Sequence, residues 1–359
     1  MAQRTPTPPA ASAKPRYRVT NWHEYDRALV ARGAITLWID EEVLAGWRAT
    51  GGRGLPYSDA AILCALGLRM VFRQPLRQTQ GFLLSLKQLL GLTIEVPHYS
   101  TFSRRAATMV VPRLTRPAGG GPLHLAIDAT GLKVHGEGEW KVRTHGKDRR
   151  RVWRKLHLGV DSTTGELLAH ALTPSDTHDG AELEGLLAQV EGPIDAVYGD
   201  KAYDAFDIHR AILAREARPV IPPRKGAAIH PPPGLKDPPP TRGAAVARIA
   251  EIGRKHWKLE TGYHRRSLAE TAMFRYKTII GPSLKARTLP NQKAEAAVAV
   301  HCLNRLTALG MPVSLRIAST KPGKGAARPQ ERLCNKAGMG RVWTAYGRCM
   351  YDSPRDRES

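Results

Sequence analysis

The sequence is poor in acidic residues. Against 55 lysines and arginines it has 32 aspartates and glutamates in 359 residues, which leaves a formal charge of +23 and a pI near 10.3. A chain with this imbalance repels itself unless its natural partner is a polyanion, so nucleic acid is the leading partner class. Ribosomal and membrane-surface proteins share such a composition and stay open as alternatives.

Cysteine and long apolar runs are also scarce. Cys64, Cys302, Cys334 and Cys349 lie far apart, and no pair has the spacing of a zinc site or a redox motif. No run of about eighteen apolar residues occurs, and residues 1–18 lack the apolar core of a signal peptide. These absences argue against a disulfide framework and a membrane partner, and they predict a cytoplasmic protein.

The first third of the chain predicts helices. Ser58 and Asp59 are a typical cap for a helix that extends to residue 71, and an apolar stripe predicts a second helix over 76–90. A short helix capped by Ser100 would carry Arg104 and Arg105, as in a helix-turn-helix with a basic second element. Two packed helices with a solvated basic end explain the same pattern equally well.

Beyond the glycines at 119–121 the pattern changes to that of an α/β fold. We expect three strands, a helix opened by a capping box at Asp179 and Glu182, a strand, a helix, a strand and a closing helix. This order is the ribonuclease H-like arrangement, a mixed sheet with flanking helices, although the fold alone does not define a function. The expected strands cover 123–128, 152–161, 167–172, 194–200 and 219–221, and the last helix covers 292–309.

The predicted organisation has four parts. They are a disordered N-terminal tail (1–18), a helical DNA-binding region (19–118), a ribonuclease H-like catalytic domain (122–318) with an exposed Pro-rich loop (222–240), and a basic, mostly disordered C-terminal tail (319–359).

Four residues near position 270 carry the strongest chemical signal. Tyr263, Arg266, Glu270 and Lys277 are spaced so that, at about 100° per residue, they fall within an arc of roughly 60° on one helix. A solvated charged face would explain an arbitrary Arg/Glu pair. The full spacing, however, should arise by accident only on the order of a few times per thousand such sequences. The face presents a carboxylate flanked by cations, as needed where a metal and a phosphate meet.

Two aspartates complete a carboxylate triad with Glu270. Asp128 and Asp200 end predicted neighbouring strands, although alone Asp128 could be a turn former and Asp200 a helix cap. Three carboxylates without a His or Cys cluster favour two Mg²⁺ ions, with Mn²⁺ as a plausible substitute. Two ions about 4 Å apart would activate an attacking water or 3′-hydroxyl and stabilise the leaving oxygen.

A dense basic segment lies between the first two predicted strands, beside Trp140 and Trp153. It is either a solvated charged loop or, next to a phosphodiester site, a surface that contacts DNA phosphates. Arg224 and Lys225 invite the same interpretation. The segment contains Lys141, Arg143, Lys147, Arg149, Arg150, Arg151, Arg154 and Lys155.

The four residues near position 270 and several longer segments resemble those of a known family. Tyrosine, arginine, glutamate and lysine at this spacing resemble the signature of DDE transposases of the insertion-sequence 4 and 5 superfamily. The segments 127–133, 137–143, 151–158 and 262–273 look like the insertion-sequence 903 branch of the insertion-sequence 5 family, and the likeness covers about residues 17–318. The Pro-rich stretch 231–240 and the tail beyond Ala318 depart from what the family leads us to expect.

The resemblance implies a bacterial transposase that binds terminal inverted repeats and target DNA. It would hydrolyse phosphodiester bonds at transposon ends and join the 3′-hydroxyl ends to target DNA, acting in the nucleoid as a homodimer or higher multimer. A nuclease or resolvase without strand transfer and a catalytically idle DNA-binding regulator are the alternatives. The implied catalytic and metal-binding residues are Asp128, Asp200 and Glu270, and the implied phosphate contacts are Tyr263, Arg266 and Lys277.

Overall fold

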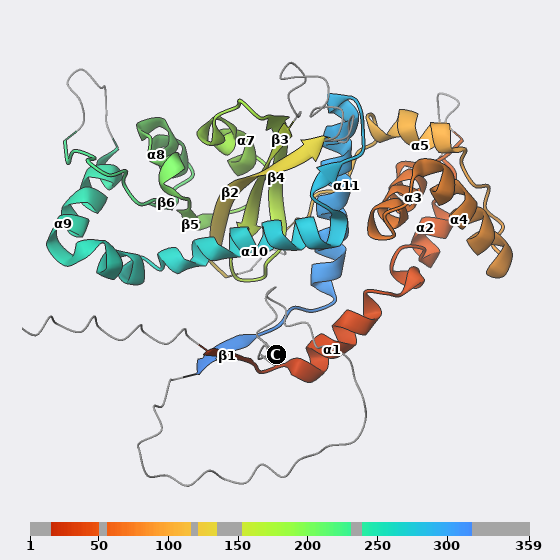
Figure 1. Ribbon diagram of the computed structural model, residues 1–359, viewed down its shortest axis with the longest axis horizontal. Coiled ribbons are helices and arrows are strands. Elements are labelled where there is room, and N and C mark those ends of the chain that lie inside the picture. Colours follow the sequence, from red (N-terminus) through yellow and green to blue (C-terminus); the bar gives the residue numbers. More distant parts are fainter. Residues whose placement is uncertain (1–15, 50–55, 116–120, 135–152, 231–238, 318–359) are drawn as a thin grey trace, which may run out of the picture. The chain divides into compact units, whose positions relative to one another are not determined.

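The computed structural model describes residues 16–49, 56–115, 121–134, 153–230 and 239–317 (Figure 1). The chain forms two compact units, one from Val30 to Leu309 and one from the two ends of the chain. No helix within the described ranges is both long enough and apolar enough to cross a membrane.

The smaller unit joins the two ends of the chain. Strand β1 (Arg16–Val19) pairs antiparallel with β8 (Ser314–Ile317), and helix α1 (Trp22–Ala31) follows β1. The Asn21 side chain receives a hydrogen bond from Val313 N at 2.7 Å and donates one to Met311 O at 3.0 Å. The sequence did not indicate this pairing, because the partners are almost 300 residues apart.

The larger unit is built on a six-stranded mixed sheet. The order is β4-β3-β2-β5-β6, with β7 paired to the far end of β2. The β2/β3 and β3/β4 pairs are antiparallel, whereas β2/β5 and β5/β6 are parallel. This topology, with its helices, is compatible with the expected ribonuclease H-like fold. The strands are β2 (Leu123–Val134), β3 (Trp153–Asp161), β4 (Leu167–Pro174), β5 (Ile194–Tyr198), β6 (Arg218–Val220) and β7 (Ser283–Leu284).

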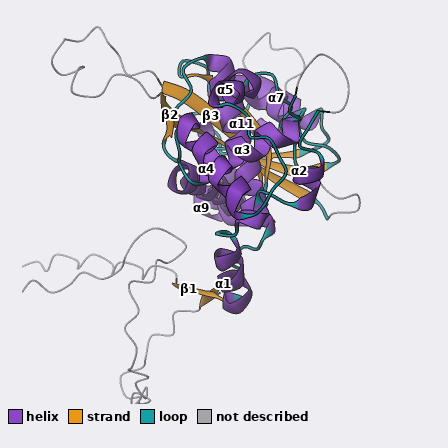
Figure 2. Cartoon of the chain, turned by 90° about the vertical axis from the view of Figure 1, so that its right-hand side faces the viewer, coloured by secondary structure: helices purple, strands orange, loops and turns teal. Residues whose placement is uncertain are grey.

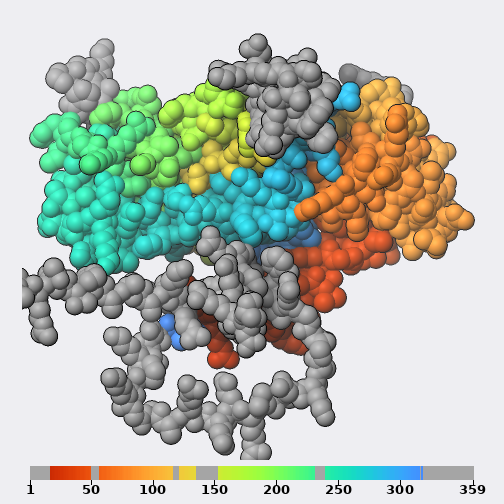
Figure 3. Space-filling model, viewed as in Figure 1, coloured from red at the N-terminus to blue at the C-terminus, as the bar shows by residue number. Residues whose placement is uncertain are grey.

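Helices cover both faces of this sheet. The alternation of side chains along β2 shows which residues of that strand point to each face. Leu125 and Ile127 pack in a core with α7 (Leu183–Leu187) and α8 (Phe206–Leu213), whereas Ala126 packs in the opposite core. Because side chains alternate along a strand, Asp128 and Thr130 share the face of Ala126. That face is covered by α9 (Pro240–Glu260), α10 (Ser267–Arg275) and α11 (Leu289–Ala308), and Figure 3 shows α9 and α10 as a band of surface.

A helical cluster packs against α11 in the same unit (Figure 2). Val298, Cys302 and Leu306 of α11 enter its core. The structure confirms the helix capped by Ser58, whose Oγ accepts from Ala61 N at 3.1 Å. Whether this cluster is a separate DNA-binding domain stays a prediction. Its helices are α2 (Glu41–Ala45), α3 (Asp59–Val71), α4 (Leu76–Leu89) and α5 (Tyr99–Ala106).

Two predicted caps are wrong. Helix α5 is capped by His98, whose Nδ1 accepts from Ser100 N at 3.4 Å, so Ser100 lies inside the first turn. The turn over Asp179–Glu182 is likewise capped by His178, and Asp179 instead pairs with Lys155 at 2.8 Å. In both places a histidine ring nitrogen accepts the hydrogen bond from a backbone amide of the first turn. The sequence had predicted that a side chain one or two residues later would do so.

The Pro-rich loop is only partly exposed. Pro222 and Pro223 are buried, contrary to the expectation of an exposed stretch from 222 onward, whereas most residues from 224 to 230 are exposed. Residues 231–238 and the predicted tail 319–359 lie outside the described residues.

Candidate active site

Asp128 lies in the middle of a strand, which corrects the expectation that it ends one. Strand β2 continues to Val134 because alternation persists beyond Gly131 and the end of the strand pairs with β7. The Asp128 side chain is 19% exposed, and its Oδ1 accepts from the Ala129 amide at 2.8 Å. Burial raises the pKa of Asp128, and the Ala129 amide opposes that shift.

Asp200 follows the neighbouring parallel strand, as predicted. The β2/β5 register pairs Ala126 with Tyr198, so two residues further along Asp200 comes level with Asp128. Its Oδ1 accepts from Ala202 N at 2.7 Å, and it therefore also caps the turn Lys201–Tyr203. The negative charge of Asp200 contributes to the raised pKa of Asp128.

Arg266 joins two of the three carboxylates. Its Nη1 donates to Asp128 Oδ2 at 2.9 Å, and its Nη2 donates to Glu270 one helical turn later. Glu270 is 56% exposed, whereas Arg266 and Asp128 are each 19% exposed. The guanidinium therefore lies between a carboxylate of the sheet and a carboxylate of α10.

The segment that carries Arg266 is not one regular α-helix. Residues Tyr263–Arg266 form a 3₁₀ turn after Gly262 at φ 67°, and α10 then passes into a π-helical turn over Tyr276–Ile280. The expectation of a single α-helix is wrong. Lys277 in the π turn nevertheless reaches the same strand, because its Nζ donates to Thr130 Oγ1 at 2.6 Å.

Arg266 and Lys277 thus contact residues two positions apart on one face of β2. Tyr263 is close as well, with its ring centroid 6.0 Å from Arg266 and 5.0 Å from the Lys258 ammonium. Burial raises the pKa of Tyr263, which keeps its phenol protonated at neutral pH.

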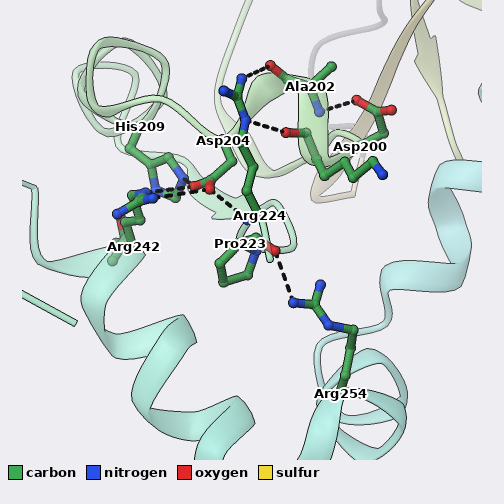
Figure 4. A network of polar contacts seen from close by, with 10 residues as sticks. Asp200, Ala202, Asp204, His209, Pro223, Arg224, Arg242 and Arg254 are labelled. Atoms are coloured by element: carbon green, nitrogen blue, oxygen red, sulfur yellow. Dashed lines mark hydrogen bonds and ion pairs between the residues drawn. The ribbon is translucent and has the colours of Figure 1, made fainter. Parts of the chain in front are cut away.

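An ionic network around the buried side chain of Asp204, which the sequence did not indicate, lies next to Asp200 (Figure 4). Asp204 accepts from Arg242 Nε at 2.8 Å and from the Arg224 amide at 2.7 Å. The Arg224 guanidinium donates to the carbonyls of Lys201 and Ala202, each at 3.2 Å. The turn that begins at Asp200 is therefore stabilised by Arg224, near the start of the Pro-rich loop, and by Arg242, just after its end. No local pattern could have revealed it, because the partners are 20 and 38 residues from Asp204.

Several predicted DNA contacts are engaged within the protein. Arg154 Nε donates to Gln292 at 2.8 Å, and Lys155 pairs with Asp179. Arg105 pairs with Asp59 at 2.5 Å and donates to Tyr57 O at 2.8 Å, whereas Arg104 is exposed. The other cations of the basic segment lie outside the described residues, namely Lys141, Arg143, Lys147, Arg149, Arg150 and Arg151.

The three carboxylates supply hard oxygen donors, which suit a divalent cation such as Mg²⁺ or Mn²⁺. Within the described ranges no group of three His, Cys, Asp or Glu side chains is close enough to hold a metal ion. The placement of Arg266 accounts for this in part, because its guanidinium occupies the space between Asp128 and Glu270.

Comparison with known proteins defines the class. Residues 119–305 match the model of a transposase DDE domain, and residues 30–137 match a second model with the same description. The first match covers more than half of the chain, which therefore belongs to the DDE transposase family. It is thus a transposition enzyme, and membership implies the use of a divalent metal.

One solved structure with some similarity is the cryo-EM structure of the piggyBac transposase synaptic complex with hairpin DNA. The TM-score is 0.35 at 11% identity, over 81% of this chain and 76% of that chain. The more specific resemblance to the insertion-sequence 5 family stays a prediction.

Proposed function

We propose that the protein is the transposase of a bacterial insertion sequence, with Asp128, Asp200 and Glu270 as its catalytic and metal-binding carboxylates. It binds the terminal inverted repeats, hydrolyses phosphodiester bonds at the transposon ends and joins the freed 3′-hydroxyls to target DNA. A homodimer or higher multimer holds the paired ends, in the cytoplasm at the nucleoid.

The observation that carries this proposal is the bridge made by Arg266. It brings Glu270 of α10 to Asp128 of β2, across 138 residues of sequence, and the β2/β5 register brings Asp200 level with Asp128. These contacts support the assignment of three carboxylates from three elements to one site, beside cations that suit a phosphate.

When bound, two Mg²⁺ ions would lower the pKa of an attacking water or 3′-hydroxyl and stabilise the leaving oxygen. The protein's own residues do the positioning. The Ala129 amide donates to one oxygen of Asp128, and the Ala202 amide donates to one oxygen of Asp200. These hydrogen bonds fix the orientation of each carboxylate and thereby the position of its other oxygen. Arg266 and Lys277 offer charged donors to the phosphate that reacts.

Conservative substitutions test the three carboxylates. Asp128→Asn, Asp200→Asn and Glu270→Gln should each lower Mg²⁺-dependent cleavage of a transposon-end duplex by at least about 1000-fold, the equivalent of about 4 kcal/mol. End binding should be largely retained. Asp207→Asn, a change at a side chain that is 88% exposed, serves as the control and should cleave like the wild type. Full activity in any of the three variants would contradict the assignment.

Strand transfer separates this function from its alternatives. A transposase joins a pre-cut 3′-hydroxyl end to a second duplex, whereas a nuclease or resolvase yields only cut products. A DNA-binding regulator would bind the ends without either reaction. Incubating the protein with a labelled pre-cut end, plasmid DNA and Mg²⁺ measures the joined product directly.

A further inference from the structure

A cavity of about 960 Å³ opens within the larger unit, between helices α3, α4 and α5 and the start of α11. Its floor is apolar and includes Leu66, Phe102 and Val298. Helices α3 and α5 lie side by side with α11 (Figure 2), so the two walls come from segments almost 200 residues apart in the sequence.

Cations dominate the polar lining of this cavity. The only carboxylate among the described lining residues is Glu295, which is already satisfied. It accepts from Lys285 N at 3.0 Å and from Ala286 N at 2.7 Å. The cationic side chains of the lining are Arg69, Arg77, Arg104, Lys285 and Arg287.

Two of these cations are compensated only in part, by the negative charge of Glu295 in the cavity wall. Arg69 Nε is buried without a hydrogen-bond partner among the described residues, and burial lowers the pKa of Arg69. Burial and the nearby charges of Arg69 and Arg73 lower the pKa of Lys285. Like charges gathered in a half-buried site cost free energy that a bound anion would offset.

The start of α11 adds neutral donors that suit an anion. Thr288 occupies the N-cap position of this 20-residue helix without a side-chain capping hydrogen bond, and it lines the cavity together with Arg287 and Asn291. Pro290 in the first turn has no N–H, so the free amides there are those of the other residues. The first amides of a helix have no partner within the helix, and its dipole favours negative charge there. Ser100 and Ser103 on α5 bring hydroxyl groups to the opposite wall.

The cavity wall is joined to the candidate active site through Arg73. The Arg73 guanidinium donates to Ile279 O at 3.2 Å, in the π turn that also carries Lys277. The Arg73 carbonyl accepts from Lys285 Nζ at 3.0 Å. A strand held in the cavity would therefore lie next to the turn that supports Lys277.

We propose that this cavity binds the phosphodiester backbone of DNA, with the exposed Arg77, Arg104, Lys285 and Arg287 on its rim and the partly buried Arg69 deeper in its wall. The inference rests on the proposed function and adds a composite site, built jointly by the helical cluster and α11. Sequence patterns did not indicate it, because only Arg104 belongs to a recognised basic helix.

Matched double variants test the cavity. Arg77→Gln with Arg287→Gln removes two exposed rim charges, whereas Lys87→Gln with Lys293→Gln removes the same charge from α4 and α11 outside the lining. Each phosphate contact contributes about 0.9 to the slope of log K against log salt, so the first variant should lose about 1.8 from that slope. Raising the salt from about 50 to about 200 mM should therefore weaken DNA binding by the first variant about 12-fold less than it weakens binding by the wild type.

The measurement is fluorescence anisotropy with a labelled DNA duplex of arbitrary sequence, and circular dichroism checks that both variants fold. The control should keep a slope closer to that of the wild type. Equal slopes for the two double variants would overturn the proposal.

Lysine footprinting tests the same site in the unaltered protein. The DNA duplex should slow acetylation of Lys285 several-fold while leaving that of exposed Lys293 nearly unchanged. Equal rates for Lys285 with and without DNA would also overturn the proposal.

Failure of this site and failure of the proposed function give different results. If the protein performs metal-dependent strand transfer but the two double variants have equal salt slopes, the cavity proposal is refuted and the proposed function stands. If DNA binding depends on the cavity residues but the wild type neither cleaves nor joins DNA, the proposed function is refuted and the cavity proposal stands.

Discussion

At the scale of single residues, the candidate site depends on charges that are paired rather than free. Arg266 pairs with both Asp128 and Glu270, and Asp204 pairs with Arg242 close to Asp200. The Asp204 pair is the more deeply buried, since the carboxylate is 0% exposed and the guanidinium 14% exposed. Removing one partner of such a pair leaves the other charged and unpaired, which is costly.

Asp204→Ala is therefore expected to lower the free energy of unfolding by about 3–5 kcal/mol. The nearby control Asp207→Ala removes an 88% exposed carboxylate paired to Arg210 at 3.3 Å, and should change stability by less than about 1 kcal/mol. Urea denaturation followed by circular dichroism measures both. Similar midpoints for the two variants would show that the network contributes little.

At the scale of elements, α11 connects the parts of the larger unit. It enters the core of the helical cluster through Cys302 and the core of the sheet through Leu303. Asn304 fastens it to the edge strand β4, because its Oδ1 accepts from Leu167 N at 2.9 Å and its Nδ2 donates to Leu167 O at 2.8 Å. One side chain thus satisfies both backbone polar groups of the buried residue Leu167.

Asn304→Leu should lower the free energy of unfolding by about 2–4 kcal/mol, because it leaves a buried N–H and a buried C=O without their partner. The exposed Lys293→Ala on the same helix should change it by less than about 0.5 kcal/mol. Hydrogen exchange of the Leu167 amide gives the local test. Unchanged protection of that amide in Asn304→Leu would mean that the hydrogen bond is not formed in solution.

At the scale of the whole molecule, the net charge of +23 suits a polyanionic partner, and three largely buried histidines have lowered pKa values. Burial lowers the pKa of His157, His170 and His209 from 6.5 to about 4. His157 donates to or accepts from Thr173 Oγ1 at 2.9 Å, and His209 lies in the same relation to Thr241 at 2.9 Å. At neutral pH these rings are uncharged, so the 4.0 Å contact of His209 with Asp204 is not an ion pair.

Stability should therefore fall as the pH is lowered. The unfolded chain binds protons at these histidines below about pH 6.5 and the folded chain only near pH 4, so the loss begins near 6.5 and levels off below about 4. The contribution is on the order of 3 kcal/mol each for His157 and His209. Urea midpoints measured from pH 7.5 to pH 4 in the wild type and in His157→Gln with His209→Gln check this, and equal slopes would contradict it.

Local sequence determined much of the framework. Period-two patterns located five of the six strands of the sheet, although they ended β2 too early and gave no sign of β7, and Ser58 located the start of α3. These features are encoded by neighbouring residues, since a strand face or an N-cap involves side chains only a few positions apart. For the same reason the spacing of Tyr263, Arg266, Glu270 and Lys277 is a property of the sequence alone.

Only the tertiary structure decided how those residues meet. It placed Asp128 inside a strand, put Arg266 between Asp128 and Glu270, and gave Asp204 its partners across the Pro-rich loop. Such contacts join residues separated by as many as 138 positions, and chain folding rather than local propensity sets them. By itself the sequence therefore determined which residues are candidates for the chemistry, whereas packing decided which of their charges lie next to one another.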